Sequence, residues 1–283
     1  MPKPELYENL VFSDQELPAY SGEAVKRNPG TTVRAHWHEQ LEMHFVVQGI
    51  GEMFLGQDTL SVQGGDLVMV NPNTLHRGEC TQGPYRHQIL VLDVADYSKE
   101  LARQNLSYLP LIQGDPTIKG YFEQIFAELK EKKPGYRSQC RGLITQLLVY
   151  LSRNFAQSSV PDRELARRRN HLERLNGAIC YIEENYRQPI TVAQLARICC
   201  LSEDRFGHLF REVTGQPPLQ YVNALRLRKA LRLLHTGDYT AGEAAEAVGF
   251  LDYNHFGRLF RKYHGIPPSQ ARREAEKIAE SYE

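Results

Sequence analysis

Three histidines and one glutamate form a group of potential metal ligands in the first third of the chain. His36, His38 and Glu42 lie within seven residues of one another, and His76 follows after several turn signals. Three imidazoles and a carboxylate suit Fe, Mn, Ni or Zn. On a β-strand, positions 36, 38 and 42 have the same parity, so all three side chains can point to one face of a sheet.

Other polar residues can share this site, with or without a metal. His44 has the parity of Glu42 and lies next to it. Buried polar groups must be paired, hydrated or liganded, so hydrogen bonding to a polar ligand is an alternative to metal binding. A sugar suits such a lining, as do other small polar molecules. We expect an effector-binding site formed by Arg34, His36, His38, Glu42, His44 and His76. Its mouth can be lined by Arg77, Tyr85 and His87.

The first 95 residues have the pattern of β-structure that would position these side chains. Short runs of β-branched and aromatic residues alternate with turn signals such as Asn28-Pro29-Gly30, Gly64-Gly65-Asp66 and Asn71-Pro72-Asn73. Turn signals at this density are typical of an all-β sandwich or barrel.

Two amphipathic helices are expected after these strands. Apolar residues recur at intervals of three and four over 118–129 and again over 140–155. A polar stretch then predicts an interdomain linker over 157–168. We expect the second helix either to pack wholly on the barrel or to form a dimer interface through its stripe of Leu143, Leu147, Leu148 and Leu151.

A segment of 13 residues occurs twice, 50 residues apart. Residues 206–218 read FGHLFREVTGQPP and residues 256–268 read FGRLFRKYHGIPP, with eight of 13 positions identical. One supersecondary unit is therefore used twice.

Each copy has the pattern of a helix-turn-helix motif. Thr191 and Thr240 are suited to cap a first helix, and Ser202 and Asp252 to cap a second one. Gly215 ends the second helix of the first copy before a Pro-Pro pair. The two predicted motifs span 191–213 and 240–263. A helix over 219–235 would separate them, so that both second helices enter successive major grooves about 34 Å apart.

The residues opposite the buried Phe/Leu stripe of each second helix are expected to face DNA. Asn suits adenine and Arg suits guanine in the major groove. Asp204 is unusual beside DNA: it can accept a hydrogen bond from a cytosine amine or only cap the helix. The predicted DNA-binding residues are Asp204, Arg205, His208, Arg211, Tyr253, Asn254, His255, Arg258 and, nearer the phosphate backbone, Arg261.

Residues 170–270 resemble the AraC/XylS family of transcription regulators. The resemblance rests on the duplicated motif, on Val248-Gly249-Phe250, and on four positions of the connecting helix: Tyr221, Arg226, Ala230 and Leu234. It departs after Pro268, where Ser269-Gln270-Ala271-Arg272-Arg273 replaces the family's aromatic residue and arginine. The family implies a DNA-binding regulator, and it favours activation.

The spacing Gly30, His36-Trp37-His38, Glu42, Gly49 resembles the first cupin motif. Residues 65–76 form a looser second motif. The resemblance implies a small antiparallel barrel with an interior site, as AraC-type sensors commonly carry. In metal cupins, the residues matching His36, His38, Glu42 and His76 bind a divalent metal, which is the one candidate cofactor. AraC-type sensors often retain a His and Glu here without metal.

Composition limits the remaining classes of function. Residues 1–165 carry a net charge of −4 and residues 166–283 a net charge of +4, which favours phosphate binding by the second part. No apolar run approaches the about 20 residues of a membrane helix, and the N-terminus lacks a signal-peptide pattern. The five cysteines are expected to be reduced thiols, with a thiol sensor as the alternative. A cytoplasmic location is expected.

Together these patterns predict an α+β protein with four parts. These are a cupin-like barrel over 1–95, helices over 96–156, the linker, and a DNA-binding domain over 169–283. We expect a regulator, not an enzyme, with double-stranded DNA, a small effector, RNA polymerase and a second copy of the chain as partners. The alternatives are a metal-dependent cupin enzyme fused to a DNA-binding module, and a barrel that only dimerises.

Overall fold

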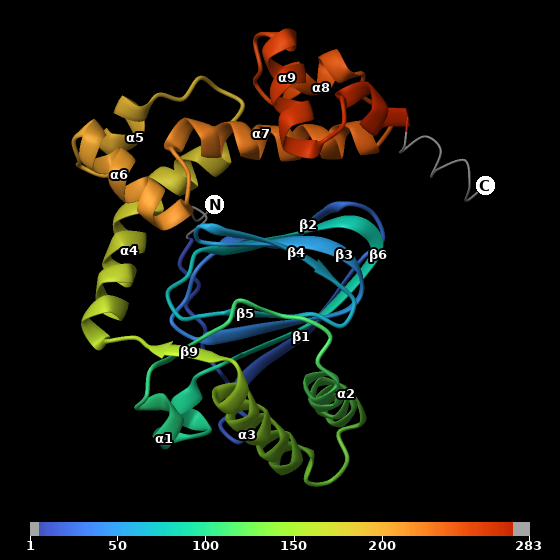
Figure 1. Cartoon of the computed structure of the whole chain (residues 1–283), viewed down its shortest axis with the longest axis vertical. Coiled ribbons are helices and arrows are strands. Elements are labelled where there is room, and N and C mark those ends of the chain that lie inside the picture. The colour runs from blue at the N-terminus through green and yellow to red at the C-terminus, as the bar shows by residue number, and fades with distance from the viewer. Residues whose placement is uncertain (1–5, 274–283) are drawn as a thin grey trace. The chain divides into compact units, whose positions relative to one another are not determined.

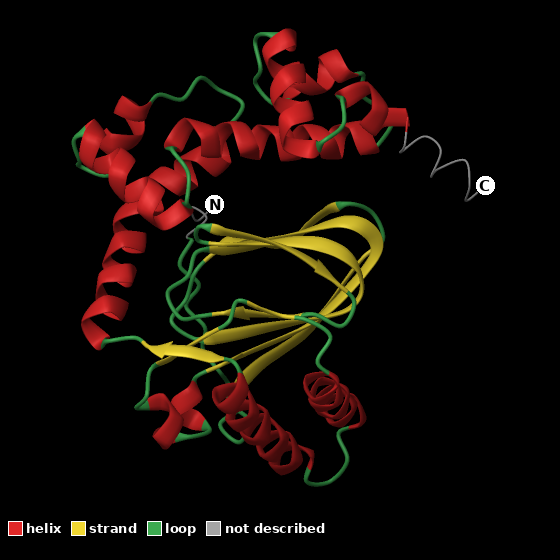
Figure 2. Cartoon of the chain, in the orientation of Figure 1, coloured by secondary structure: helices red, strands yellow, loops and turns green. Residues whose placement is uncertain are grey.

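The computed structural model describes residues 6–273, which divide into two compact units with a boundary between Glu173 and Arg174. The first unit combines an antiparallel sheet with helices, and the described part of the second is helical (Figure 2). The predicted α+β class is therefore confirmed. Within residues 6–273, none of the helices has the length and apolar character needed to cross a membrane.

Two long strands organise the sheet of the first unit (Figure 1). β3 pairs with β5 near its start and with β4 near its end, while β6 pairs with β2 near its start and with β1 near its end. Because both strands change partners along their length, the sheet curves into two layers. The strands are β1 (Ala19–Lys26), β2 (Gly30–His36), β3 (Leu41–Leu55), β4 (Asp58–Gln63), β5 (Leu67–Val70), β6 (His76–Leu92) and β8 (Leu111–Ile112).

Alternation along these strands gives the sheet two buried faces. On β3, Met43 and Phe45 belong to the core that faces the helices, whereas Val46 belongs to a second core inside the barrel. Glu42 and His44 have the parity of Val46 and are also buried. The interior of the barrel is therefore apolar in one part and polar in another.

Helices α2 (Pro116–Glu131) and α3 (Tyr136–Asn154) cover the outer face of the sheet (Figure 1). Asp115 caps α2 by accepting hydrogen bonds from the backbone amides of Thr117 and Ile118. Both helices were predicted, with their ends displaced by a few residues.

The leucine stripe of α3 is buried within a single chain. Leu147, Leu148 and Leu151 are completely buried, and Leu143 is 7% exposed. All four belong to the core between the sheet and the two helices. The prediction that this stripe forms a dimer interface is wrong, because its own chain already covers it. The sequence shows the width of the stripe but not the size of the face that receives it.

The region predicted as a linker, 157–168, has regular structure instead. β9 (Ala156–Ser159) pairs with β7 (Leu106–Tyr108), and α4 (Asp162–Asn185) begins three residues after β9. Residues 157–159 are exposed, which explains why an edge strand has the polar composition of a linker. Two short elements, η1 (Val94–Asp96) and α1 (Lys99–Ala102), precede β7.

Five helices of the second unit form the predicted duplicated arrangement. Phe256 and Phe260 of the second copy pack with the end of α7 and with α8, and Phe206 and Phe210 of the first copy are equally buried. Beyond the end of α4, the helices are α5 (Val192–Ile198), α6 (Glu203–Thr214), α7 (Pro218–His235), α8 (Ala241–Ala247) and α9 (Tyr253–His264).

Candidate DNA interface and barrel histidine site

The first helix of each helix-turn-helix motif begins with a reciprocal cap. Thr191 accepts a hydrogen bond from the backbone amide of Gln194 at 3.2 Å, and its own amide donates to the Gln194 side chain at 2.9 Å. Thr240 and Glu243 repeat this arrangement at 3.2 and 2.8 Å. Helices as short as α5 and α8 are marginal by themselves, so these capping boxes help to fix where each motif starts.

The second helices are capped as predicted. Ser202 accepts from the backbone amide of Arg205 at 3.4 Å, and Asp252 accepts from the amides of Asn254 and His255 at 2.8 and 3.1 Å. These amides hold the pKa of Asp252 below its usual value. Because Ser202 is the cap of α6, the capping alternative for Asp204 is wrong.

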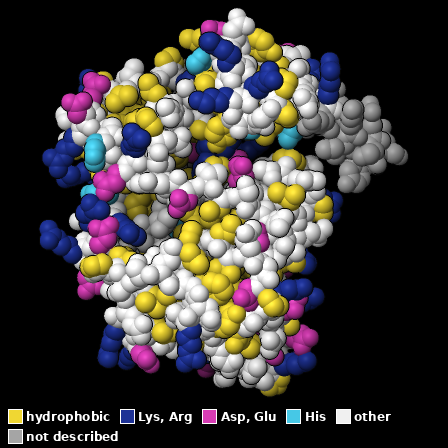
Figure 3. All heavy atoms as spheres, viewed as in Figure 1, with side chains coloured by type: hydrophobic (Ala, Val, Ile, Leu, Met, Phe, Trp, Pro, Cys, Tyr) yellow, Lys and Arg dark blue, Asp and Glu magenta, His cyan; other side chains and the backbone are white. Residues whose placement is uncertain are grey.

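The predicted DNA-binding residues lie on the solvent side of α6 and α9. The phenylalanines at 206, 210, 256 and 260 are completely buried. On the face of the molecule shown in Figure 3, several Lys and Arg side chains lie over the helices of the second unit. The exposed residues include all nine predicted: Asp204, Arg205, His208, Arg211, Tyr253, Asn254, His255, Arg258 and Arg261.

Two residues hold the loop between α4 and α5 against the rest of the second unit. Arg226 of α7 donates to the carbonyl oxygens of Tyr186 and Gln188 at 2.6 and 2.8 Å. Gly249 has φ +90°, and a Cβ at this position would collide with the carbonyl of Arg187. Only glycine fits a left-handed turn with backbone so close.

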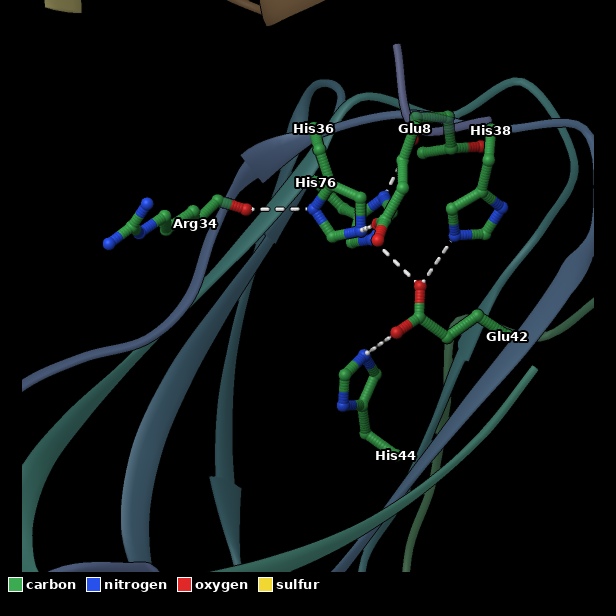
Figure 4. A network of polar contacts seen from close by, with 8 residues as sticks. Glu8, Arg34, His36, His38, Glu42, His44 and His76 are labelled. Atoms are coloured by element: carbon green, nitrogen blue, oxygen red, sulfur yellow. Dashed lines mark hydrogen bonds and ion pairs between the residues drawn. The ribbon is translucent and has the colours of Figure 1, made fainter. Parts of the chain in front are cut away.

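In the first unit, the predicted histidines and glutamate meet inside the barrel (Figure 4). His36 ends β2, His38 lies between β2 and β3, Glu42 belongs to β3, and His76 begins β6. One potential ligand atom from each lies within 4.8 Å of those from the other three. Oε2 of Glu42 lies 2.8 Å from Nε2 of both His38 and His76, while Oε1 lies 2.9 Å from Nε2 of His44.

Backbone carbonyls orient two of these rings. Nδ1 of His36 lies 2.8 Å from the carbonyl oxygen of Arg34, and Nδ1 of His76 lies 2.9 Å from that of Thr74. Since a carbonyl oxygen only accepts, Nδ1 of each ring donates the hydrogen bond. If the ring is neutral, its Nε2 then has no hydrogen and carries a lone pair.

This geometry fits a metal ion. Nε2 of His76 points at an oxygen of Glu42, and two lone pairs face each other favourably only when a proton or a cation lies between them. A histidine that donates Nδ1–H to a carbonyl and presents Nε2 is the usual metal-binding arrangement. Ligand atoms about 2 Å from a shared metal lie about 3–4 Å apart, close to the spacing here.

Electrostatics keep His36 neutral and Glu42 charged at neutral pH. Burial lowers the pKa of His36 to about 3; the nearby His76 acts in the same direction and Glu42 opposes it. Burial alone would raise the pKa of Glu42, but the surrounding imidazoles of His44, His76 and His38 outweigh it and hold that pKa well below its usual range. The carboxylate is therefore charged and acts only as an acceptor.

The structure places five of the six predicted effector residues together. The exception is Arg34, which contributes its backbone carbonyl, while its exposed side chain points away from the cluster (Figure 4). Sequence reasoning missed Glu8, whose Oε2 lies 3.0 Å from Nε2 of His36. No local pattern marks Glu8, because it precedes the first strand. His87 was placed only at the mouth, although its position on β6 shares the inward parity of Tyr85.

Within residues 6–273, none of the five cysteines forms a disulfide bond. Burial raises the pKa of the thiols of Cys80, Cys140 and Cys199, in the case of Cys140 to about 11. A raised pKa disfavours the reactive thiolate, so these three sites do not have the character of thiol sensors.

The fold and the two sites define a regulator with a DNA-binding unit and a ligand-binding unit. Comparison with known families agrees: residues 24–148 match the AraC-like ligand binding domain and residues 195–274 match a helix-turn-helix domain. The chain is 33% identical over 257 residues to the HTH-type transcriptional activator RhaS of Escherichia fergusonii, covering 87% of this chain and 90% of that protein. It belongs to the AraC family of transcriptional regulators, and the families it matches are regulators rather than enzymes.

Two further matches are more distant or cover less of the chain. An uncharacterised HTH-type transcriptional regulator of Bacillus subtilis, YisR, is 25% identical over 93% of this chain and 96% of its own length. Among solved structures, a probable AraC family regulator from Rhodopseudomonas palustris is 30% identical, covering 36% of this chain and 97% of its own, with a TM-score of 0.35.

Proposed function

We propose that this protein activates transcription by binding a specific DNA site through both helix-turn-helix motifs, in response to a small polar effector held in the barrel. The observation that carries the proposal is the buried Glu42 carboxylate, which faces Nε2 of three histidines in a chain that also exposes two recognition helices. Activation is supported by relatives that are named transcriptional activators. A carbohydrate effector agrees with the polar lining.

We infer that the barrel also holds a divalent metal. His36, His38, Glu42 and His76 would bind it, since their ligand atoms converge and two of the rings are oriented by backbone carbonyls. A bound metal would supply positive charge beside Glu42 and a coordination position for an oxygen of the effector.

The remaining partners follow from this role. We expect it to act together with RNA polymerase at a promoter, and we expect a cytoplasmic location. We expect a homodimer, with an interface other than the leucine stripe of α3, because that stripe is buried in its own chain.

Replacing His38 and Glu42 together by Ala tests the sensing role. We expect the full-length variant to keep its affinity for operator DNA and to lose transcriptional response to the effector. Elemental analysis of untagged wild-type protein should find about one divalent metal per chain, and the double variant should contain none. A folded double variant that still responds fully would show that the effector binds elsewhere, and metal-free wild-type protein would exclude the metal.

A further inference from the structure

A second group of buried polar atoms lies beside the Glu42 cluster. His44 and His87 are each 1% exposed, with ring centroids 5.3 Å apart, and the ring of Tyr85 lies 5.3 Å from that of His87. Within residues 6–273, no group makes a hydrogen bond with Nδ1 of His44 or with either ring nitrogen of His87. Buried polar side chains without partners are uncommon, so these three nitrogens need an explanation.

The two ring nitrogens of His44 have different surroundings: Nε2 faces Glu42, whereas Nδ1 has no hydrogen-bond partner within residues 6–273. Its Nε2 lies 2.9 Å from Oε1 of Glu42, so this nitrogen carries the hydrogen. Nδ1 lies on the opposite side of the ring, away from Glu42 (Figure 4). In a neutral ring Nδ1 accepts, and in a charged ring it donates. A hydroxyl group can satisfy either form, because it both donates and accepts.

His87 presents one donor and one acceptor. Burial and the neighbouring His44 lower its pKa and Glu42 opposes them, which leaves the pKa at about 3, so the ring is neutral. The surrounding interior core is apolar and includes Val46, Val68 and Val70. A partner for His87 must therefore offer both hydrogen-bonding roles in otherwise apolar surroundings.

We propose that His44 and His87 form an inner subsite for an uncharged, hydroxyl-bearing ligand, with one hydroxyl group bridging the two imidazoles. This inference rests on the proposed effector-sensing function and specifies the class of effector. A carboxylate cannot donate to a histidine acceptor, and its charge would be buried near Glu42. An ammonium group cannot accept from a histidine N–H. A hydroxyl group meets all the requirements and adds no charge.

The first test needs no ligand. In His87→Leu, two unpartnered buried nitrogens are replaced by apolar atoms, so the ligand-free full-length protein should melt about 2–4 °C higher than wild type. Arg86→Gln, one residue away on the exposed side of the same strand, serves as the control. It removes only an exposed ion pair with Glu23 and should change the Tm little. A lower Tm for His87→Leu would mean that internal water or the protein already satisfies His87, and would overturn the inference.

The second test uses matched probes. Neutral monosaccharides and alditols are compared with the corresponding sugar acids by thermal shift and calorimetry on full-length protein. We expect a neutral compound to bind wild type and Arg86→Gln equally. His87→Leu should bind it at least about tenfold more weakly, and His87→Gln, which keeps a donor and an acceptor, should recover part of the loss.

In this second test, three outcomes would overturn the subsite: binding by the acids alone, equal binding by wild type and His87→Leu, or no binding by any neutral compound. The proposed function is tested separately by the response of the His38 and Glu42 double variant. If that variant loses the response while the His87 variants keep it, the sensing function stands and the inner subsite does not.

Discussion

At the scale of single residues, the two recognition helices differ most in their first turn. α6 begins with Glu203 and Asp204, whereas α9 begins with Tyr253 and Asn254. The carboxylates of α6 would repel DNA phosphates, but an acidic residue in the major groove can accept a hydrogen bond from the cytosine amine. Since Ser202 caps α6, Asp204 is available for this role.

Replacing Asp204 by Ala should therefore change DNA recognition and not stability. We expect higher affinity for random DNA, because one negative charge is removed, and loss of a cytosine preference at one position of the operator, worth about 1–3 kcal/mol. Binding to a library of single-base operator variants measures both effects. A clear fall in Tm, or an unchanged preference at every position, would contradict this role.

The depressed histidine pKa values predict how barrel stability depends on pH. The pKa of His36 and of His87 is about 3 in the folded chain, and about 6.5 in an unfolded chain. Between these two pH values the unfolded chain binds more protons than the folded chain. The contribution of these neutral histidines to the free energy of unfolding is therefore complete above about pH 6.5 and is lost as the pH falls towards 3.

As the pH falls within that window, each of these two histidines should lower the free energy of unfolding by about 1.4 kcal/mol for each pH unit. Urea unfolding of metal-free protein can be followed by the fluorescence of Trp37, the single tryptophan, which is buried in the first unit. His87→Leu should reduce the slope. A slope that is the same in this variant would show that His87 does not titrate as described.

At the scale of elements, the helix ends were the most predictable part of the structure. Thr191, Ser202, Thr240 and Asp252 all cap the helices assigned to them, because a cap depends on a few adjacent residues. Strand parity likewise placed Glu42 and His44 inside the barrel. β9 was missed because edge pairing with β7 depends on a partner about 50 residues away. The contact of Glu8 with His36 and the burial of the α3 leucines likewise depend on tertiary structure, which neighbouring residues in the sequence do not reveal.

The turn between α8 and α9 should be intolerant of substitution. In Gly249→Ala, the added Cβ would meet the carbonyl of Arg187 in a left-handed backbone conformation, and we expect a loss of about 1–3 kcal/mol. Gly257 offers the matched control, because it lies in α9 with open space around it. Gly257→Ala should be neutral or stabilising by up to about 1 kcal/mol. Equal Tm values for both variants would contradict the close approach at Gly249.

At the scale of the whole molecule, DNA binding and ligand binding belong to separate compact units. The second part of the chain carries the net positive charge and both recognition helices. The linker predicted between the units is structured, so the division falls within α4 rather than in a loop.

A fragment containing residues 169–283 should bind operator DNA by itself. Its affinity should fall steeply with salt, with a slope of about −0.9 for each phosphate that it neutralises. Fluorescence anisotropy between about 50 and 200 mM salt measures this slope. A folded fragment that shows no binding at the lower salt concentration would contradict the assignment of this region.

The position of Glu42 has a consequence for the logic of the response. One oxygen of its carboxylate faces His38 and His76, and the other faces His44. A cation that draws electron density towards the first oxygen makes the second a weaker acceptor and changes how firmly His44 is held. Thermodynamic linkage requires the reverse effect to be equally large. Such a carboxylate would couple the binding of a cation at one oxygen to the binding of a ligand beside His44 at the other. The chain would then respond to the combination of the two and not to either one independently.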